Sequence, residues 1–292
     1  MDFKKKEYPC GICGANDTTH LYTLKDFTVV RCKSCGFVYV NPRIANEELS
    51  TLYSSDYFRN HDFGYLDYEA TAYLRKKSFE RWYKDIKPFL AREKGNALDI
   101  GCASGYFLEV LQNDGWKVEG IELDPRTIEV LKTKNIPAYT NTFDTFQSDK
   151  KYHLITLFDV LEHLPDIEDT FKRLSSLLHP DGAIALITPN ADSFQHKLFG
   201  KRWFQLKPVE HIHYFSPSTL QRAVAPHNLK VTTIMKGGQY ADVNFILNRL
   251  RQYHYKGLYK FFSFIFKSFG LHNACFYTDT GSLFAIIKKA NK

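Results

Sequence analysis

A turn of small residues within 96–107 constrains the fold of this chain most, because it joins an apolar strand to a helix. Gly101 and Gly105 leave no Cβ where a bound molecule must approach the backbone, and a helix beginning near Tyr106 directs unpaired N–H groups at that molecule. The pattern Asp-x-Gly-x-x-x-Gly, which starts at Asp99, lacks the Lys-Ser/Thr of a phosphate loop and differs from Gly-x-Gly-x-x-Gly. The turn predicts a cofactor site for which a nucleoside triphosphate or a dinucleotide is a second choice.

A carboxylate follows the next predicted strand. Residues 116–121 form this strand, and Glu122 stands at its end, about 20 residues after the glycines. A carboxylate in this place accepts hydrogen bonds from both ribose hydroxyls and repels a 2′-phosphate. The alternative is a tight strand-to-helix turn in which Glu122 faces solvent.

A third candidate segment is the short turn that follows the buried strand predicted at 152–158. Ligands of doubly wound folds bind at the carboxyl ends of the strands. Phe158 and Val160 are therefore expected beside the cofactor, and Glu162 and His163 at the lip of its site. For His163, a turn residue bonded to the backbone is an equal alternative.

These three segments resemble motif I, the acidic second-strand end and the fourth-strand segment of class I S-adenosylmethionine-dependent methyltransferases. The resemblance implies an enzyme with S-adenosylmethionine as methyl donor, and an adenine contact after the third strand, where the motif of this chain is degenerate. It implies cofactor contacts from Asp99, Gly101, Cys102, Ala103, Gly105, Tyr106, Phe107, Glu122, Leu123, Thr142, Phe143, Phe158, Asp159, Val160 and His163.

Four cysteines predict a metal site near the N-terminus. Cys10, Cys13, Cys32 and Cys35 form two Cys-x-x-Cys knuckles separated by 18 residues, a spacing typical of a zinc ribbon with a closed structural Zn²⁺ site. About 40 residues bury too little apolar surface to fold alone, so the metal is expected to supply folding energy. A ribbon can also bind nucleic acid, but residues 18–31 between the knuckles are apolar and nearly neutral, which disfavours that role.

Alternating strand and helix patterns predict an α/β fold with a seven-stranded, mostly parallel Rossmann-like sheet. Strands are expected near 96–101, 116–121, 137–140, 152–158, 182–188, 229–235 and 281–288, and helices near 105–114, 125–134, 166–178 and 217–226. The predicted domains are a zinc ribbon at 1–42, a helical connector or lid at 43–92 with one or two helices from 65 to about 90, and the methyltransferase domain at 93–292 with a helical insertion at 239–280.

A cluster of proton-transfer groups precedes the helix predicted near 217–226. Glu210, His211, His213 and Tyr214 lie within five positions, and a strand-like backbone would turn both imidazoles to one side. Glu-His-x-x-Tyr resembles the pattern of zinc-containing sugar C-methyltransferases and of a broader group of zinc-ribbon methyltransferases linked to surface glycans. The resemblance implies that His211 is the catalytic base and that Tyr214 assists, with Glu210 and His213 as further catalytic candidates. Structural roles for His211 and His213 are the alternative.

Composition limits the remaining choices. The chain has 44% hydrophobic residues, a net charge of +7, no secretory signal pattern and no apolar run of about 18 residues, so a cytoplasmic protein is expected. Its basic residues are scattered rather than gathered in one arm, which is typical of solvated faces. The apolar segment 258–269 is interpreted as a lid or dimer face, with contact to the inner membrane surface as the sharper alternative. The sequence leaves the oligomeric state open.

The favoured reaction is O-methylation of a sugar or glycan hydroxyl, as in polysaccharide biosynthesis, with a histidine as general base. This chain is shorter than the zinc-containing sugar C-methyltransferases, which makes C-methylation of a nucleotide sugar an alternative rather than the favoured reaction. Methylation of a quinol or another small phenolic molecule is a further alternative, as is an RNA methyltransferase that uses the ribbon to bind RNA.

Overall fold

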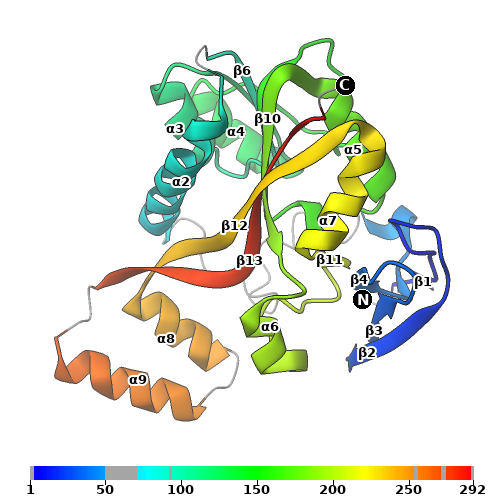
Figure 1. Ribbon diagram of the computed structural model, residues 1–292. Coiled ribbons are helices and arrows are strands. Elements are labelled where there is room, and N and C mark those ends of the chain that lie inside the picture. Colours follow the sequence, from blue (N-terminus) through cyan, green and yellow to red (C-terminus); the bar gives the residue numbers. More distant parts are fainter. Residues whose placement is uncertain (1–2, 50–70, 92–93, 253–255, 271–273, 291–292) are drawn as a thin grey trace.

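A seven-stranded sheet organises the computed structural model, which describes residues 3–49, 71–91, 94–252, 256–270 and 274–290 (Figure 1). Its strands are β6 (Asn96–Ile100), β7 (Lys117–Ile121), β8 (Ala138–Tyr139), β9 (Tyr152–Phe158), β10 (Leu178–Pro189), β12 (Leu229–Asp242) and β13 (Cys275–Lys289). They lie in the order β12-β13-β10-β9-β6-β7-β8. Strands β10 to β8 are parallel, whereas β13 runs antiparallel to both of its neighbours. This confirms the predicted Rossmann-like, mostly parallel sheet.

Helices cover both faces of the sheet, which explains why its central strands are apolar runs rather than alternating ones. On one face, α5 (Ile167–Leu177) and α7 (Pro217–Val224) pack on alternate side chains such as Leu98 and Ile155. On the other, α3 (Tyr106–Asn113) and α4 (Pro125–Thr133) pack on Ala97 and Leu154. All four helices lie inside the predicted ranges.

Helix α2 (Ala72–Ile86) belongs with the α3 side of the sheet. The ring centroids of Phe79 and Phe107 lie 5.7 Å apart, and Trp82 Nε1 donates to the Gly238 carbonyl at 2.7 Å. These contacts join α2 to the sheet domain, although the sequence placed residues 43–92 in a connector. The aromatic residues at 57, 58, 65 and 68, and the rest of 50–70, lie outside the described residues.

The N-terminal ribbon forms a four-stranded sheet whose fourth strand comes from a part of the chain distant in sequence. Strands β2 (Thr18–Leu24), β3 (Phe27–Cys32) and β4 (Val38–Val40) continue into β11 (His213–Tyr214), with His213 opposite Tyr39. A smaller ladder pairs β1 (Lys5–Lys6) with β5 (Arg43–Ile44). The predicted domain boundary at residue 42 is therefore crossed by strand pairing. Segments before and after residue 42 belong to the same sheets.

Strands β12 and β13 extend past the sheet and carry two helices. Gly238–Asp242 pairs with Cys275–Asp279, and among the residues of this region that the structure describes only α8 (Val243–Gln252) and α9 (Lys256–Ser268) are helical. The helical insertion predicted at 239–280 is therefore wrong at both ends, where aromatic and β-branched residues favour strands. Among the described residues, no helix combines the length and apolarity that a membrane span requires.

We expect truncation of Phe37 to destabilise the contact between ribbon and sheet domain. Its ring is fully buried, with centroids 5.1 Å from Phe215 and 5.5 Å from His213. Phe37→Ala should lower the free energy of unfolding by about 3–5 kcal/mol. In the matched control Phe264→Ala, where the side chain is 72% exposed, the change should stay within about 0.5 kcal/mol. Denaturant titration measures both, and equal losses would contradict the packing described here.

Candidate functional site

The glycine turn lies at the carboxyl end of β6, where ligands of such sheets bind. Gly101 and Gly105 have φ angles of +70° and +74°, which glycine adopts without strain. A Cβ at Gly101 would lie 2.6 Å from Val160 Cγ2, and one at Gly105 would lie 2.3 Å from Leu131 Cδ2. The turn therefore requires glycine at both positions, because neighbouring side chains of the protein fill the space that a Cβ would occupy. Gly101 is exposed, whereas Gly105 is buried.

Glu122 ties the end of β7 to this turn. Its carboxylate accepts hydrogen bonds from the backbone N–H groups of Ala103 at 2.9 Å, Leu123 at 2.7 Å and Asp124 at 3.1 Å. Burial raises the pKa of Glu122, and these three donors act against that shift. A carboxylate offers about four acceptor sites, so Glu122 retains acceptor capacity for a ribose hydroxyl. The turn and this carboxylate together fit the nucleoside part of S-adenosylmethionine.

Asp99, at the start of the turn, is bonded to the neighbouring strand. Its side chain is buried, and the Thr156 hydroxyl of β9 donates to Asp99 Oδ1 at 2.6 Å. Burial raises the pKa of Asp99 to about 7. Sequence reasoning missed Thr156, although a hydroxyl inside an apolar strand, one strand away from a buried carboxylate, is the signal that points to it.

Strained backbone marks the ends of two parallel strands. Ala103 and Asp159 have φ angles of +43° and +55°, in the left-handed region that costs a non-glycine residue of order 1–3 kcal/mol. Such residues cluster at ligand sites. Asp159 is exposed and lies near the positive charges of Arg75 and Lys207.

The other residues predicted to contact the cofactor are divided between the turn, the core and the surface. Val160 abuts Gly101, whereas Phe158 packs among aromatic rings, with centroids 4.9 Å from both Trp82 and Phe107. Cys102, Tyr106, Phe107 and Phe143 are buried, and Leu123 and Thr142 are exposed. Phe107 and Phe143 lie in the cores on opposite faces of the sheet, so tertiary packing accounts for both.

Two imidazoles and a carboxyl group meet near the ends of β9 and β10. One ligand atom from each of Glu162, His163 and His211 lies within 4.8 Å of the others. The rings of His163 and His211 are 4.9 Å apart and perpendicular, at 86°. This arrangement is both a candidate acid–base centre and a possible set of metal ligands, since two histidines and a carboxylate are common donors.

Backbone carbonyls fix the tautomers of both histidines. His163 Nδ1 lies 3.0 Å from the Glu210 carbonyl, and His211 Nδ1 lies 2.8 Å from the Gln205 carbonyl. A carbonyl only accepts, so in each neutral ring the proton sits on Nδ1 and the lone pair on Nε2. Burial lowers the pKa of His163 to about 4 and that of His211 well below 6.5, so both rings are neutral at pH 7.

Glu162 and Lys207 complete the surroundings of the two rings. Thr188 donates to Glu162 Oε2 at 2.9 Å, and burial raises the pKa of Glu162 well above 4.5, which favours the protonated acid. Lys207 Nζ lies 3.9 Å from Glu210 Oε2, and its charge lowers the pKa of both His163 and His211. Sequence reasoning missed Thr188 and Lys207; the lysine lies only three residues before Glu210.

His213 does not join this cluster. It belongs to β11, and its ring centroid lies 5.5 Å from that of Phe37 on the ribbon side. Burial lowers its pKa to about 3. The expected strand-like geometry, with His211 and His213 on one side, is wrong. His211 lies before β11 begins, and its backbone N–H donates to the Lys207 carbonyl in a turn instead of pairing in the strand. Tyr214 is also buried, with its ring 6.4 Å from that of His211.

The four cysteines form a second cluster, inside the ribbon. Their sulfur atoms all lie within 4.8 Å of one another, and the pairs Cys10–Cys35 and Cys13–Cys32 are 3.5 Å apart. Each knuckle closes in the same way, since Gly14 donates to the Cys10 carbonyl at 2.8 Å and Gly36 to the Cys32 carbonyl at 2.9 Å. Zn–S bonds of about 2.3 Å in a tetrahedron separate sulfur atoms by about 3.8 Å. The donor set and its geometry fit zinc.

Comparison with known proteins agrees with this fold. A ubiquinone biosynthesis O-methyltransferase of Nitrosospira multiformis is 24% identical over 177 residues, which cover 52% of this chain and 74% of that protein. One of Coxiella burnetii is 25% identical over 164 residues, covering 52% and 70%. The plantazolicin methyltransferase BpumL, solved with SAH, has the same fold: the TM-score is 0.54 at 16% identity, covering 83% of this chain and 94% of that one.

A family model described as a methyltransferase domain matches residues 73–234, which is more than half of the chain. The match begins within α2, in agreement with the packing of that helix on α3. It ends within β12, so it spans the glycine turn, Glu122 and the histidine cluster. The chain therefore belongs to this methyltransferase family and is an S-adenosylmethionine-dependent methyltransferase.

Proposed function

We propose that this enzyme methylates a hydroxyl group of a small quinol-type or phenolic molecule. The observation that carries the proposal is the His211 ring, held neutral with its lone pair on Nε2 at the ligand-binding edge of the sheet. The relatives named ubiquinone biosynthesis O-methyltransferase support this acceptor. They favour the quinol alternative over the sugar or glycan hydroxyl that the sequence predicted.

S-adenosylmethionine supplies an electrophilic methyl group when it is bound. The backbone of the glycine turn would hold the donor, and Glu122 would accept hydrogen bonds from its ribose hydroxyls. The protein must then align the acceptor oxygen with the methyl group and remove its proton.

His211 Nε2 would take that proton from the acceptor hydroxyl. The Gln205 carbonyl, which accepts from Nδ1–H at 2.8 Å, orients the ring and stabilises the imidazolium that results. The Lys207 ammonium favours the anionic form of a nearby hydroxyl, because opposite charges lower the pKa of an acid. A phenolic hydroxyl, with a pKa near 10, needs less help to ionise than a sugar hydroxyl.

We expect His211→Ala to lower kcat roughly 10²–10⁴-fold while S-adenosylmethionine affinity, measured by calorimetry, stays unchanged.

Burial holds the pKa of His211 well below 6.5. The deprotonated base therefore persists on acidification, and wild-type kcat should show no fall centred at pH 6.5. A labelled-methyl assay against quinols, catechols, nucleotide sugars, lipid-linked glycans and RNA identifies the acceptor.

The exposed His20 of β2 provides the matched control, and His20→Ala should leave kcat unchanged. Methyl transfer to sugars or RNA without transfer to any phenolic molecule would refute the proposed acceptor. Full activity of His211→Ala on the true acceptor would refute the base.

We further propose that the ribbon cysteines hold one structural zinc ion. Support comes from four sulfur donors that lie within 4.8 Å of one another and from two knuckles that repeat the same backbone hydrogen bonds. Such a site is closed to substrate, so the metal would act on folding rather than on methyl transfer.

Metal analysis should find about one zinc per chain, and Cys32→Ser should lose it and lower the thermal unfolding midpoint. The matched control is Cys275→Ser, which changes a cysteine of β13 outside the cluster and should keep the zinc. A wild-type protein without zinc, or Cys32→Ser with full zinc content, would contradict the assignment.

A further inference from the structure

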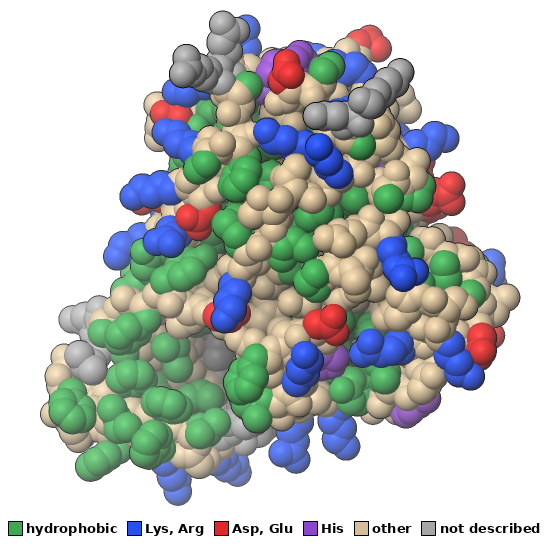
Figure 2. Space-filling model, viewed as in Figure 1, with side chains coloured by type: hydrophobic (Ala, Val, Ile, Leu, Met, Phe, Trp, Pro, Cys, Tyr) green, Lys and Arg blue, Asp and Glu red, His purple; other side chains and the backbone are tan. Residues whose placement is uncertain are grey.

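Helix α9 exposes large apolar side chains that the fold does not cover. All thirteen residues of α9 are described, and none is buried. Leu258, Phe261 and Phe264 are 42%, 57% and 72% exposed, and Phe269, just after the helix, is 73% exposed. Figure 2 shows the resulting apolar patch over α8 and α9. Contiguous exposed patches of this kind mark interaction sites.

A different set of apolar side chains already holds α9 in place. Phe262, Ile265 and Phe266 are half-buried. The ring of Phe266 stacks on that of Phe276 of β13, with centroids 6.5 Å apart. The outward residues therefore add little to the folding of the helix, and burial elsewhere is what would stabilise them.

The segment that carries this patch has charges of one sign. Between Val243 and Thr278 the sequence contains five lysine or arginine residues and no aspartate or glutamate. Lys256, Lys260 and Lys267 are spaced by four and seven residues, so they share one side of α9, and all three are exposed. An apolar face bordered by a lysine stripe is the pattern of helices that lie in a membrane interface.

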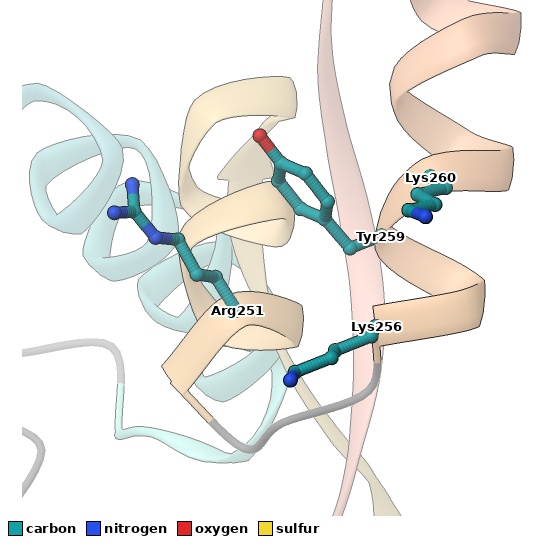
Figure 3. A pocket seen from close by; sticks show the side chains of 4 residues that line it. All are labelled: Arg251, Lys256, Tyr259 and Lys260. Carbon is teal, nitrogen blue, oxygen red and sulfur yellow. The ribbon is translucent and has the colours of Figure 1, made fainter.

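A cleft of about 340 Å³ joins the two helices at this stripe. It is lined by Arg251 of α8 and by Lys256, Tyr259 and Lys260 of α9 (Figure 3). Three cations around one cleft attract an anionic group such as a lipid phosphate.

Helix α6 (Phe194–Phe199) adds similar residues at the same end of the molecule (Figure 1). Phe194 and Leu198 are 72% and 60% exposed, and Lys197 and Lys201 beside them are exposed as well. Helix α6 follows β10, so this end is also the ligand-binding edge of the sheet.

We propose that this face, formed by the exposed residues of α9 and α6, docks onto the surface of an anionic lipid bilayer. The apolar side chains enter the interface while the lysines contact lipid phosphates. A second copy of the chain fits less well, because a symmetric contact would bring two cationic faces together. The proposal does not depend on which hydroxyl is methylated, although a membrane-bound acceptor would reach the site from this end.

Co-sedimentation with vesicles tests the proposal, without cofactor or acceptor. Wild-type protein should bind vesicles of phosphatidylcholine with 25% phosphatidylglycerol far better than pure phosphatidylcholine, and high salt should weaken that binding. Lys256→Gln/Lys260→Gln/Lys267→Gln should reduce binding about 100-fold. Phe261→Ser/Phe264→Ser, which keeps the charge, should reduce it roughly 10- to 100-fold.

The control Lys117→Gln/Lys172→Gln/Lys230→Gln removes the same charge from exposed positions on β7, α5 and β12, and should bind like wild type. Circular dichroism and thermal unfolding confirm that each variant is folded. Equal binding to both vesicle types, absence of binding, or an equal loss in the control overturns the proposal. So does a dimer that Phe261→Ser/Phe264→Ser dissociates while vesicle binding is unchanged. Because no methyl transfer is measured, failure of the proposed acceptor leaves this result intact.

Discussion

The pairing of β4 with β11 is the contact on which the proposed site depends. Strand β11 is only two residues long, and its hydrogen bonds to β4 hold His213 and Tyr214 against the ribbon. Ile212 bonds through its carbonyl to Val40 and through its N–H to the Glu162 carbonyl, so this segment bridges the ribbon and the histidine cluster. A short segment of this kind keeps its place only while both partners are folded. Folding of the cysteine cluster is thereby coupled to the position of His211.

Burial of ionisable groups gives the site its chemistry, and the same burial lowers the stability of the folded protein. Asp99 and Glu162 both have raised pKa values, because their charged forms lose hydration inside the protein. His163 and His211 stay neutral for the same reason. Together with the left-handed backbone at Ala103 and Asp159, these groups oppose folding, and the apolar cores on both faces of the sheet compensate. The result is an edge with a neutral base and a rigid turn.

The proposed membrane face and the proposed methyl-transfer site lie in separate parts of the molecule. The first rests on exposed apolar and cationic residues of α9 and α6, the second on the buried rings near β9 and β10. Both lie toward the carboxyl ends of the parallel strands. An apolar acceptor dissolved in a bilayer would therefore approach the site from the side on which the protein docks.

Local pattern determined the sheet, the glycine turn and the cysteine knuckles, because each is encoded by residues close together in the chain. The sequence also pointed to Glu122 and His163, since the ends of parallel strands meet at one edge, and the Glu-His-x-x-Tyr resemblance pointed to His211. It did not reveal that β11 completes the ribbon sheet, that His213 faces Phe37, or that α2 packs on α3. Nor did it reveal the support from Thr156, Thr188 and Lys207. These features join segments distant in sequence, and only the packing of the folded chain decides which distant groups meet.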